Sequence, residues 1–235
     1  MSLNLSKNNF LGLIPARYNS KGFPQKNVKK VNNKFLIDYT IEAAINSKSL
    51  NYIYLNSESD KILNIGKKYP INLYKRNKTL SKDKTNANEI VFDFLKKIKR
   101  KISLNNLYIV YLQPTSPLRN SNHIDKAIKL FNKYKKVDSL VSGYKYSNKI
   151  LKSFFVDTQL FLKPLSHRSF LNTNRQKLPN IFMSNGAIYI VDAKKFFSHK
   201  KFITNNTIFF EMNKRDSLDI DNKEDLMLFK RLTTK

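Results

Sequence analysis

The chain has 235 residues and a formal net charge of +27, from 44 Lys and Arg against 17 Asp and Glu. Its length suits one sizeable domain with a small insertion rather than two full domains, and its 17 Phe and 12 Tyr argue against a disordered chain. It contains no Cys, which excludes disulfides, cysteine-ligated zinc and thiol nucleophiles. Any metal chemistry is therefore expected to rest on carboxylates.

The positive charge has two interpretations. A basic surface attracts phosphate, so a nucleic-acid-binding protein is one alternative. Lys and Asn are spread along the whole chain, however, rather than gathered into one binding segment. A general compositional bias is the simpler explanation, and we expect no nucleic acid partner.

The apolar runs of the chain are short. None approaches the roughly 18 residues that suggest a membrane span. The first residues, MSLNLSKNNF, also lack the basic and apolar segments of a signal peptide. We expect a cytoplasmic protein with no membrane partner.

Apolar runs bounded by turn residues alternate with stretches of helical period, which is the pattern of an α/β protein with a parallel sheet. Strands are expected at residues 10–14, 52–55, 71–74, 107–112 and 187–191. Helices are expected at residues 36–45, 60–68, 89–98, 223–232 and from 123 onward. We interpret residues 1–235 as a single domain.

The pattern changes after residue 139 to short β-like runs separated by polar stretches. We interpret residues 144–178 as a small inserted region. Its aromatic side chains either pack internally, which is the commoner arrangement, or form an interface with a second copy. These aromatic residues are Tyr144, Tyr146, Phe154, Phe155 and Phe161.

Ligands of open α/β sheets bind at the carboxyl ends of the strands, and a basic loop follows the first expected strand. It reads IPARYNSKGFPQKN over residues 14–27. Its cations, Arg17, Lys21 and Lys26, suit a polyphosphate, and Gly22 permits close approach of the backbone. The loop matches neither the Walker A pattern nor GxGxxG.

Two further polar clusters follow later strands. LQPTSPLR, at residues 112–119, presents Gln113, Thr115 and Ser116 from a turn that two prolines make rigid. RQKLP begins at Arg175, whose guanidinium suits bidentate recognition of a carboxylate or phosphate, and NGAIYI begins at Asn185.

The last cluster is DSLDID at residues 216–221. Its alternation places Asp219 and Asp221 on the same side of an extended segment. Two such oxygen donors can share Mg²⁺ with substrate phosphates. A D-x-D alone is more often a solvated turn or a helix cap.

These blocks, in this order, resemble the acylneuraminate cytidylyltransferases (CMP-sialic acid synthetases), and the resemblance runs from about residue 10 to 232. The first block resembles that family's IPAR-x-x-SKG-x-P-x-KN, with Tyr18 and Asn19 where relatives often have glycines. Asn77 replaces the usual proline of a further block, and residues 56–58 replace the family's S-T-D. We assign residues 56–58 no role.

The resemblance implies a Rossmann-like nucleotidyltransferase fold with a small dimerisation subdomain, and a homodimer whose active site is completed by the partner. It implies Mg²⁺ as cofactor and CTP and an acidic nine-carbon sugar as substrates. Lys26 and Arg17 would be catalytic. The nucleotide would be bound by Arg17, Lys21, Lys26, Asn27 and Arg76, the sugar by Gln113, Thr115, Ser116, Arg175 and Asn185, and the metal by Asp219 and Asp221.

The implied reaction transfers CMP from CTP to the anomeric hydroxyl of the sugar and releases pyrophosphate. The PTSP and NGAIYI blocks favour a neuraminic-like or legionaminic-like acceptor over pseudaminic or octulosonic acid. By the same resemblance, the product would serve the synthesis of a bacterial surface glycan.

Overall fold

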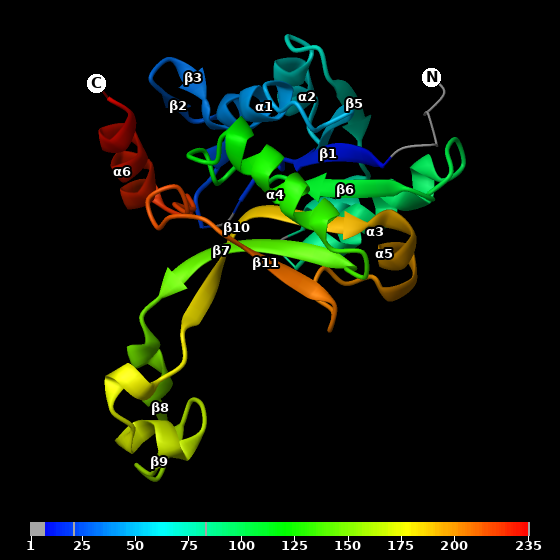
Figure 1. Ribbon diagram of the computed structural model, residues 1–235. Coiled ribbons are helices and arrows are strands. Elements are labelled where there is room, and N and C mark those ends of the chain that lie inside the picture. Colours follow the sequence, from blue (N-terminus) through cyan, green and yellow to red (C-terminus); the bar gives the residue numbers. More distant parts are fainter. Residues whose placement is uncertain (1–7, 21, 83, 235) are drawn as a thin grey trace.

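The computed structural model describes residues 8–20, 22–82 and 84–234, and its centre is a seven-stranded sheet of order β11-β7-β10-β6-β1-β4-β5 (Figure 1). All neighbouring pairs are parallel except those of β10, which runs antiparallel to both β6 and β7. The expectation of a parallel sheet is therefore correct except at β10. The strands are β1 (Asn9–Pro15), β4 (Tyr52–Ser57), β5 (Asn72–Lys75), β6 (Leu107–Tyr111), β7 (Ser139–Tyr146), β10 (Ile181–Asp192) and β11 (Thr207–Glu211).

Helices cover both faces of this sheet. One face packs against α1 (Leu36–Ile45), α2 (Asp60–Gly66) and α4 (Ser121–Lys133), whose apolar residues share a core cluster with Ile14 and Val110. The other face packs against α3 (Ala87–Ile98) and α5 (Ala193–His199). The α/β class predicted from the sequence is confirmed, and α5 and β11 are elements that the pattern did not reveal.

The last helix, α6 (Lys223–Thr233), packs at one end of the sheet against α1 and the hairpin of β2 (Lys30–Val31) and β3 (Lys34–Phe35) (Figure 1). Its Phe229 is fully buried and meets the ring of Tyr39 edge-on at 4.9 Å. Short 3₁₀ helices complete the chain at Lys26–Val28, Lys78–Ser81, Asn148–Lys152, Arg168–Asn172 and Arg175–Lys177.

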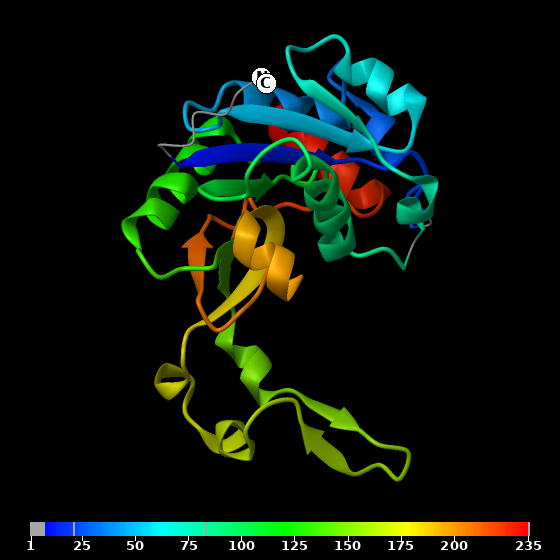
Figure 2. The ribbon, with the colours of Figure 1, turned by 90° about the vertical axis from the view of Figure 1, so that its right-hand side faces the viewer.

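An arm projects from the sheet where β7 and β10 continue beyond their neighbours (Figures 1 and 2). It carries the hairpin of β8 (Phe154–Val156) and β9 (Leu162–Pro164). Its Phe155 and Phe161 are 63% and 65% exposed, whereas Tyr144 and Tyr146 are partly buried and their rings meet at 6.1 Å. The arm lies in the stretch where the sequence indicated an insertion, whereas residues 139–143 are a buried strand of the central sheet.

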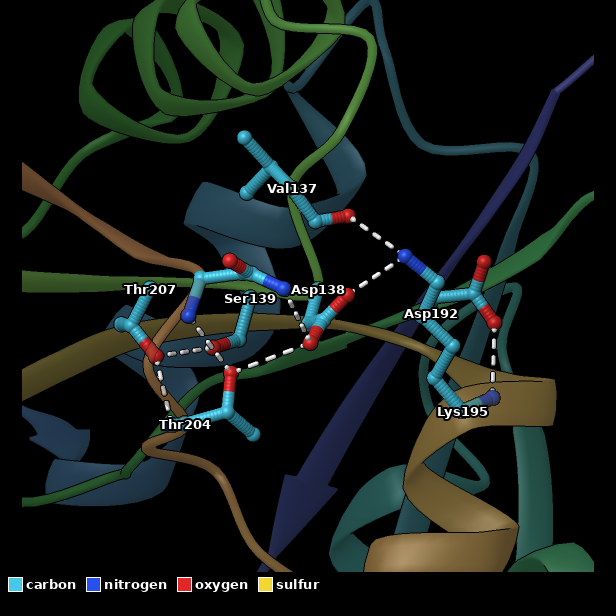
Figure 3. Close-up of polar contacts among 8 residues, drawn as sticks. Val137, Asp138, Ser139, Asp192, Lys195, Thr204 and Thr207 are labelled. Carbon is cyan, nitrogen blue, oxygen red and sulfur yellow. Dashed lines mark hydrogen bonds and ion pairs between the residues drawn. The ribbon is translucent and has the colours of Figure 1, made fainter.

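A polar cluster fastens the sheet at the amino end of β7 (Figure 3). The carboxylate of Asp138 accepts hydrogen bonds from Lys195 of α5 and from Thr204 and Asn206, which precede β11. Burial raises the pKa of Asp138, but the bonds and charge of Lys195 outweigh it and hold the pKa below its usual value. The cluster therefore joins α5, β7 and the approach to β11.

Among the residues that the structure describes, no helix is both long enough and apolar enough to span a membrane.

Candidate active site

A cavity whose lining includes four cations, here called the basic cavity, opens at the carboxyl ends of β1 and β6. It gathers most of the site residues predicted from the sequence, although they come from four separate segments of the chain. This is the edge where ligands of α/β sheets bind. The predicted residues that line it are Arg17, Lys26, Asn27, Arg76, Gln113, Thr115, Asp219 and Asp221.

Lys26 joins the first and last of these segments. It follows the loop after β1, and its Nζ donates to the carbonyl of Ile220 and pairs with Asp221 Oδ1, both at 3.0 Å. The lysine side chain is 14% exposed, whereas that of Asp221 is 71% exposed. The ammonium is thus held at the wall of the cavity, beside the aspartates predicted to bind metal.

Asn27 closes the loop that carries Arg17. Its Nδ2 donates to the Arg17 carbonyl at 2.9 Å, and its buried Oδ1 has no hydrogen-bond partner in the described chain. Asn27 therefore fixes the basic loop and keeps one acceptor available at the cavity.

Arg76 is buried, with 4% of its surface exposed, and its guanidinium is held by residues at the carboxyl end of β4. Nη2 pairs with Glu58 at 2.9 Å, and Nη1 donates to Asn56 Oδ1 at 3.2 Å. Burial lowers the pKa of Arg76, and the charge of Glu58 opposes that shift. Glu58 also accepts from the backbone N–H of Tyr18, so it connects Arg76 to the basic loop.

Residues 56–58, to which the sequence assigns no role, do contribute to the site, because Asn56 and Glu58 position Arg76. Their place at the carboxyl end of a strand, before a basic segment, is the signal that could have identified them.

Asp219 is largely buried, and its position depends on the turn after β6. The N–H of Ile220 donates to the Thr115 carbonyl at 2.8 Å, which holds Asp219 beside this turn. Burial raises the pKa of Asp219. Its Oδ1 has no hydrogen-bond partner among the described residues.

This arrangement fits a magnesium ion that is shared with a substrate. Asp219 offers an unpartnered oxygen, and Asp221 offers an exposed carboxylate in the same cavity. Within the described residues, no cluster of three or more His, Cys, Asp or Glu could enclose a metal. Mg²⁺ typically takes one or two carboxylates and completes its shell with phosphates and water, so two aspartates are a sufficient donor set.

A second, wider cavity adjoins the first, and Gln113 and Asp219 line both. Its volume is about 780 Å³, against about 250 Å³ for the basic cavity. The other residues that line this wide cavity are Tyr144, Ser184, Asn185, Gly186, Tyr189, Lys214, Arg215, Ser217, Leu218, Leu228 and Leu232.

Gly186 leaves room for Gln113 between the two cavities. Its φ is +72°, and a Cβ at this position would lie 2.8 Å from Gln113 Oε1. A side chain here would both strain the backbone and displace the glutamine amide. A glycine is therefore required if Gln113 is to reach both cavities.

Asn185 lines the wide cavity, but its amide is occupied within the protein. Oδ1 accepts from Ser142 of β7 at 2.7 Å, and Nδ2 donates to Ser217 at 2.8 Å. These bonds tie β7, β10 and the final loop together. Direct contact between Asn185 and a sugar stays a prediction.

Two other predicted residues lie apart from this group. Ser116 is fully buried and lines neither cavity. Arg175 lies on the arm, where it lines a separate hollow with Lys145 and Asn148. Lys21 lies outside the described residues.

Arg119 is a residue of the site region that the sequence did not single out. It is almost wholly buried, and its Nη2 donates to Thr40 at 2.7 Å and to the Gln113 carbonyl at 3.3 Å. Burial lowers its pKa to about 9. The guanidinium thus holds the turn that presents Gln113 and Thr115.

Comparisons with known proteins identify the family. The family model described as Cytidylyltransferase matches residues 11–233. An N-acylneuraminate cytidylyltransferase of Escherichia coli is 32% identical over 93% of this chain and 50% of its own length. A CMP-N,N'-diacetyllegionaminic acid synthase of Legionella pneumophila is 30% identical over 94% of this chain and 95% of its own. The chain spans about half the length of several curated relatives that it matches.

Solved structures support the fold. CMP:2-keto-3-deoxy-manno-octonic acid synthetase, in a complex with CTP, superposes with a TM-score of 0.69 at 13% identity, over 95% of this chain and 98% of that one. A 4-diphosphocytidyl-2C-methyl-D-erythritol synthase gives 0.68 at 9% identity, over 97% and 100%. The sheet is therefore that of a Rossmann-like nucleotidyltransferase, and the chain belongs to the cytidylyltransferase family that includes the N-acylneuraminate cytidylyltransferases.

Proposed function

We propose that this protein transfers CMP from CTP to the anomeric hydroxyl of a nonulosonic acid of the neuraminic or legionaminic type. The observation that carries the proposal is the pair of adjoining cavities that share Gln113 and Asp219. A transfer between two substrates requires that they meet in one place with the reacting atoms aligned. The basic cavity suits the nucleotide phosphates, and the wide cavity suits the sugar.

In the proposed reaction, the sugar hydroxyl attacks the α-phosphate. A new O–P bond forms, the bond to the pyrophosphate oxygen breaks, and the hydroxyl proton is lost to water. Arg17 and Lys26 oppose the negative charge that builds on the phosphate oxygens. When bound by Asp219 and Asp221, Mg²⁺ would add charge neutralisation and favour ionisation of the hydroxyl.

The protein contributes mainly by holding its charged side chains in fixed positions around the substrates. Lys26 is anchored on Ile220 and Asp221, so its charge is fixed before the substrate arrives. Arg76 is fixed by Glu58 in the same way, close to where the base of the nucleotide would lie. Charges that are already oriented cost little reorganisation in the transition state.

We propose further that the protein works as a homodimer in the cytoplasm, where CTP is available. The exposed aromatic side chains of the arm suit a subunit contact, because large apolar patches on soluble proteins commonly mark interfaces. Arg175 lines neither cavity of its own chain, so a partner's arm is the route by which this arginine would reach a bound sugar.

The proposal is tested by pyrophosphate release from CTP and Mg²⁺. N-acetylneuraminic, N,N'-diacetyllegionaminic, pseudaminic and octulosonic acids are offered separately, with Asp221→Ala as the control. We expect release with a neuraminic or legionaminic acid, absent from the control. No release with any of these sugars from a folded protein would refute the proposal.

A further inference from the structure

Helix α6 presents two different faces. Leu226 and Phe229 pack with Leu36 and Val31 in the core cluster at the end of the sheet. Leu228 and Leu232, one helical turn apart, lie on another face and line the wide cavity. The core therefore does not require leucine at these two positions.

These leucines make part of the cavity wall apolar. Leu228 is 44% exposed, and Leu218 of the final loop lies beside it in the same cavity. Arg215 donates from Nη2 to the Leu232 carbonyl at 3.3 Å, which fastens the end of α6 to that loop. The wall is thus held in place relative to Asp219.

We infer that Leu228 and Leu232 form a subsite for an apolar substituent of the acceptor, such as the methyl of an acylamido group. The inference rests on the proposed function, since the occupant must be the sugar that meets the nucleotide beside Asp219. Lys214 and Arg215 at the same cavity suit the acidic group of that sugar. The protein consequently favours an acidic sugar with more acyl groups over one with hydroxyls in their place.

The reason lies in the physical chemistry of the wall. A hydroxyl placed against leucine loses its hydrogen bonds to water without replacement, whereas a methyl gains from leaving water. The glutamine amide and the charges near Asp219 and Arg215 recognise the polar end of the sugar. The leucines then discriminate among sugars that share that end.

The experiment compares kcat/KM for N,N'-diacetyllegionaminic acid with that for N-acetylneuraminic acid, which has one acetamido group fewer. The variants are Leu228→Gln and Leu232→Gln. Met227→Gln is the matched control, because Met227 is 43% exposed on the same helix but does not line the cavity. The melting temperature and the KM for CTP are measured for each variant.

The wild type is expected to prefer the diacetyl sugar, and each leucine variant to lower that preference by roughly tenfold. The melting temperature, the KM for CTP and the control variant should stay as in the wild type. Unchanged preference in both leucine variants overturns the inference, and a change only in oligomeric state assigns the leucines to a subunit contact instead. A wild type inactive with every sugar refutes the proposed function itself, so the two failures are distinguishable.

Discussion

The polar groups at the two ends of the sheet differ in whether the protein itself supplies their hydrogen-bond partners. At the amino end of β7, the carboxylate of Asp138 is satisfied by Lys195, Thr204 and Asn206 (Figure 3). At the carboxyl ends of the strands, Asp219 Oδ1 and Asn27 Oδ1 are buried without a hydrogen-bond partner in the described chain. Buried polar groups are normally paired, so their concentration at one edge indicates where a ligand supplies the missing bonds.

The contrast separates residues that hold the fold from residues that serve a substrate. Groups paired within the protein should affect stability when they are changed and leave catalysis intact. Groups held ready for a ligand should do the opposite, because stability and activity make opposing demands at such sites.

The largest effect is expected for Asp219→Asn. Loss of a metal-binding carboxylate should lower kcat by at least roughly 100-fold, since a catalytic metal supplies several kcal/mol of charge stabilisation. Burial raises the pKa of Asp219, which means that the ionised carboxylate destabilises the folded protein at neutral pH. Asparagine carries no charge and removes this destabilisation. The melting temperature should therefore be unchanged or higher, as measured by calorimetry. A marked fall in melting temperature would place Asp219 among the residues that hold the fold.

A comparable loss is expected for Lys26→Gln. Removing one preorganised charge from the phosphates should lower kcat by about 100-fold, with little effect on the KM for the sugar. Steady-state kinetics with each substrate varied in turn measure both constants. An effect confined to the KM for the sugar would contradict the placement of Lys26 at the phosphates.

A smaller effect is expected for Arg119→Met, which removes a buried charge that forms no ion pair with a carboxylate of the described residues. The turn that carries Gln113 and Thr115 loses its anchor, so kcat/KM for the sugar should fall by about tenfold. Stability should not fall, because apolar side chains commonly replace buried charges without loss. Kinetics and thermal unfolding measure the two effects, and reduced stability with normal kinetics would contradict the prediction.

The smallest effect is expected at the amino end. Asp138→Asn should lower the free energy of unfolding at pH 7 by about 1 kcal/mol and leave kcat/KM unchanged. The pKa of Asp138 lies below its usual 3.8, so its stabilisation is present above that pH and is lost as pH falls through the lowered pKa. Denaturant unfolding should therefore show the difference shrinking in acid. A changed kcat/KM would contradict the assignment of Asp138 to the residues that stabilise the fold without serving the substrate.

Much of the fold could be predicted from hydrophobic periodicity. The helices α1, α3, α4 and α6 and the strands β1, β4 and β6 lie where the sequence indicates them, because each has a clear apolar run or stripe. The orientation of β10 could not be predicted, since strand direction depends on pairing partners distant in sequence. The elements α5 and β11 have seven and five residues, which are too few to show a clear period.

The residues of the site were likewise predictable only where their role did not depend on partners distant in the sequence. The lysine, arginine and aspartate residues stood out because the blocks that carry them follow strands. Glu58 and Arg119 did not, because their importance lies in contacts with residues far away in the sequence, Arg76 for the first and Thr40 for the second. Arg175 was grouped with the sugar-binding residues, yet the arm carries it away from both cavities of its own chain.

The most direct measurement is a crystal structure of the protein with CTP and Mg²⁺ and without an acceptor. We expect the triphosphate to lie against Arg17 and Lys26, the metal to lie on Asp219 and Asp221, and the wide cavity beside them to be empty. Nucleotide bound at another surface, with these four side chains uninvolved, would contradict the assignment of this edge as the active site.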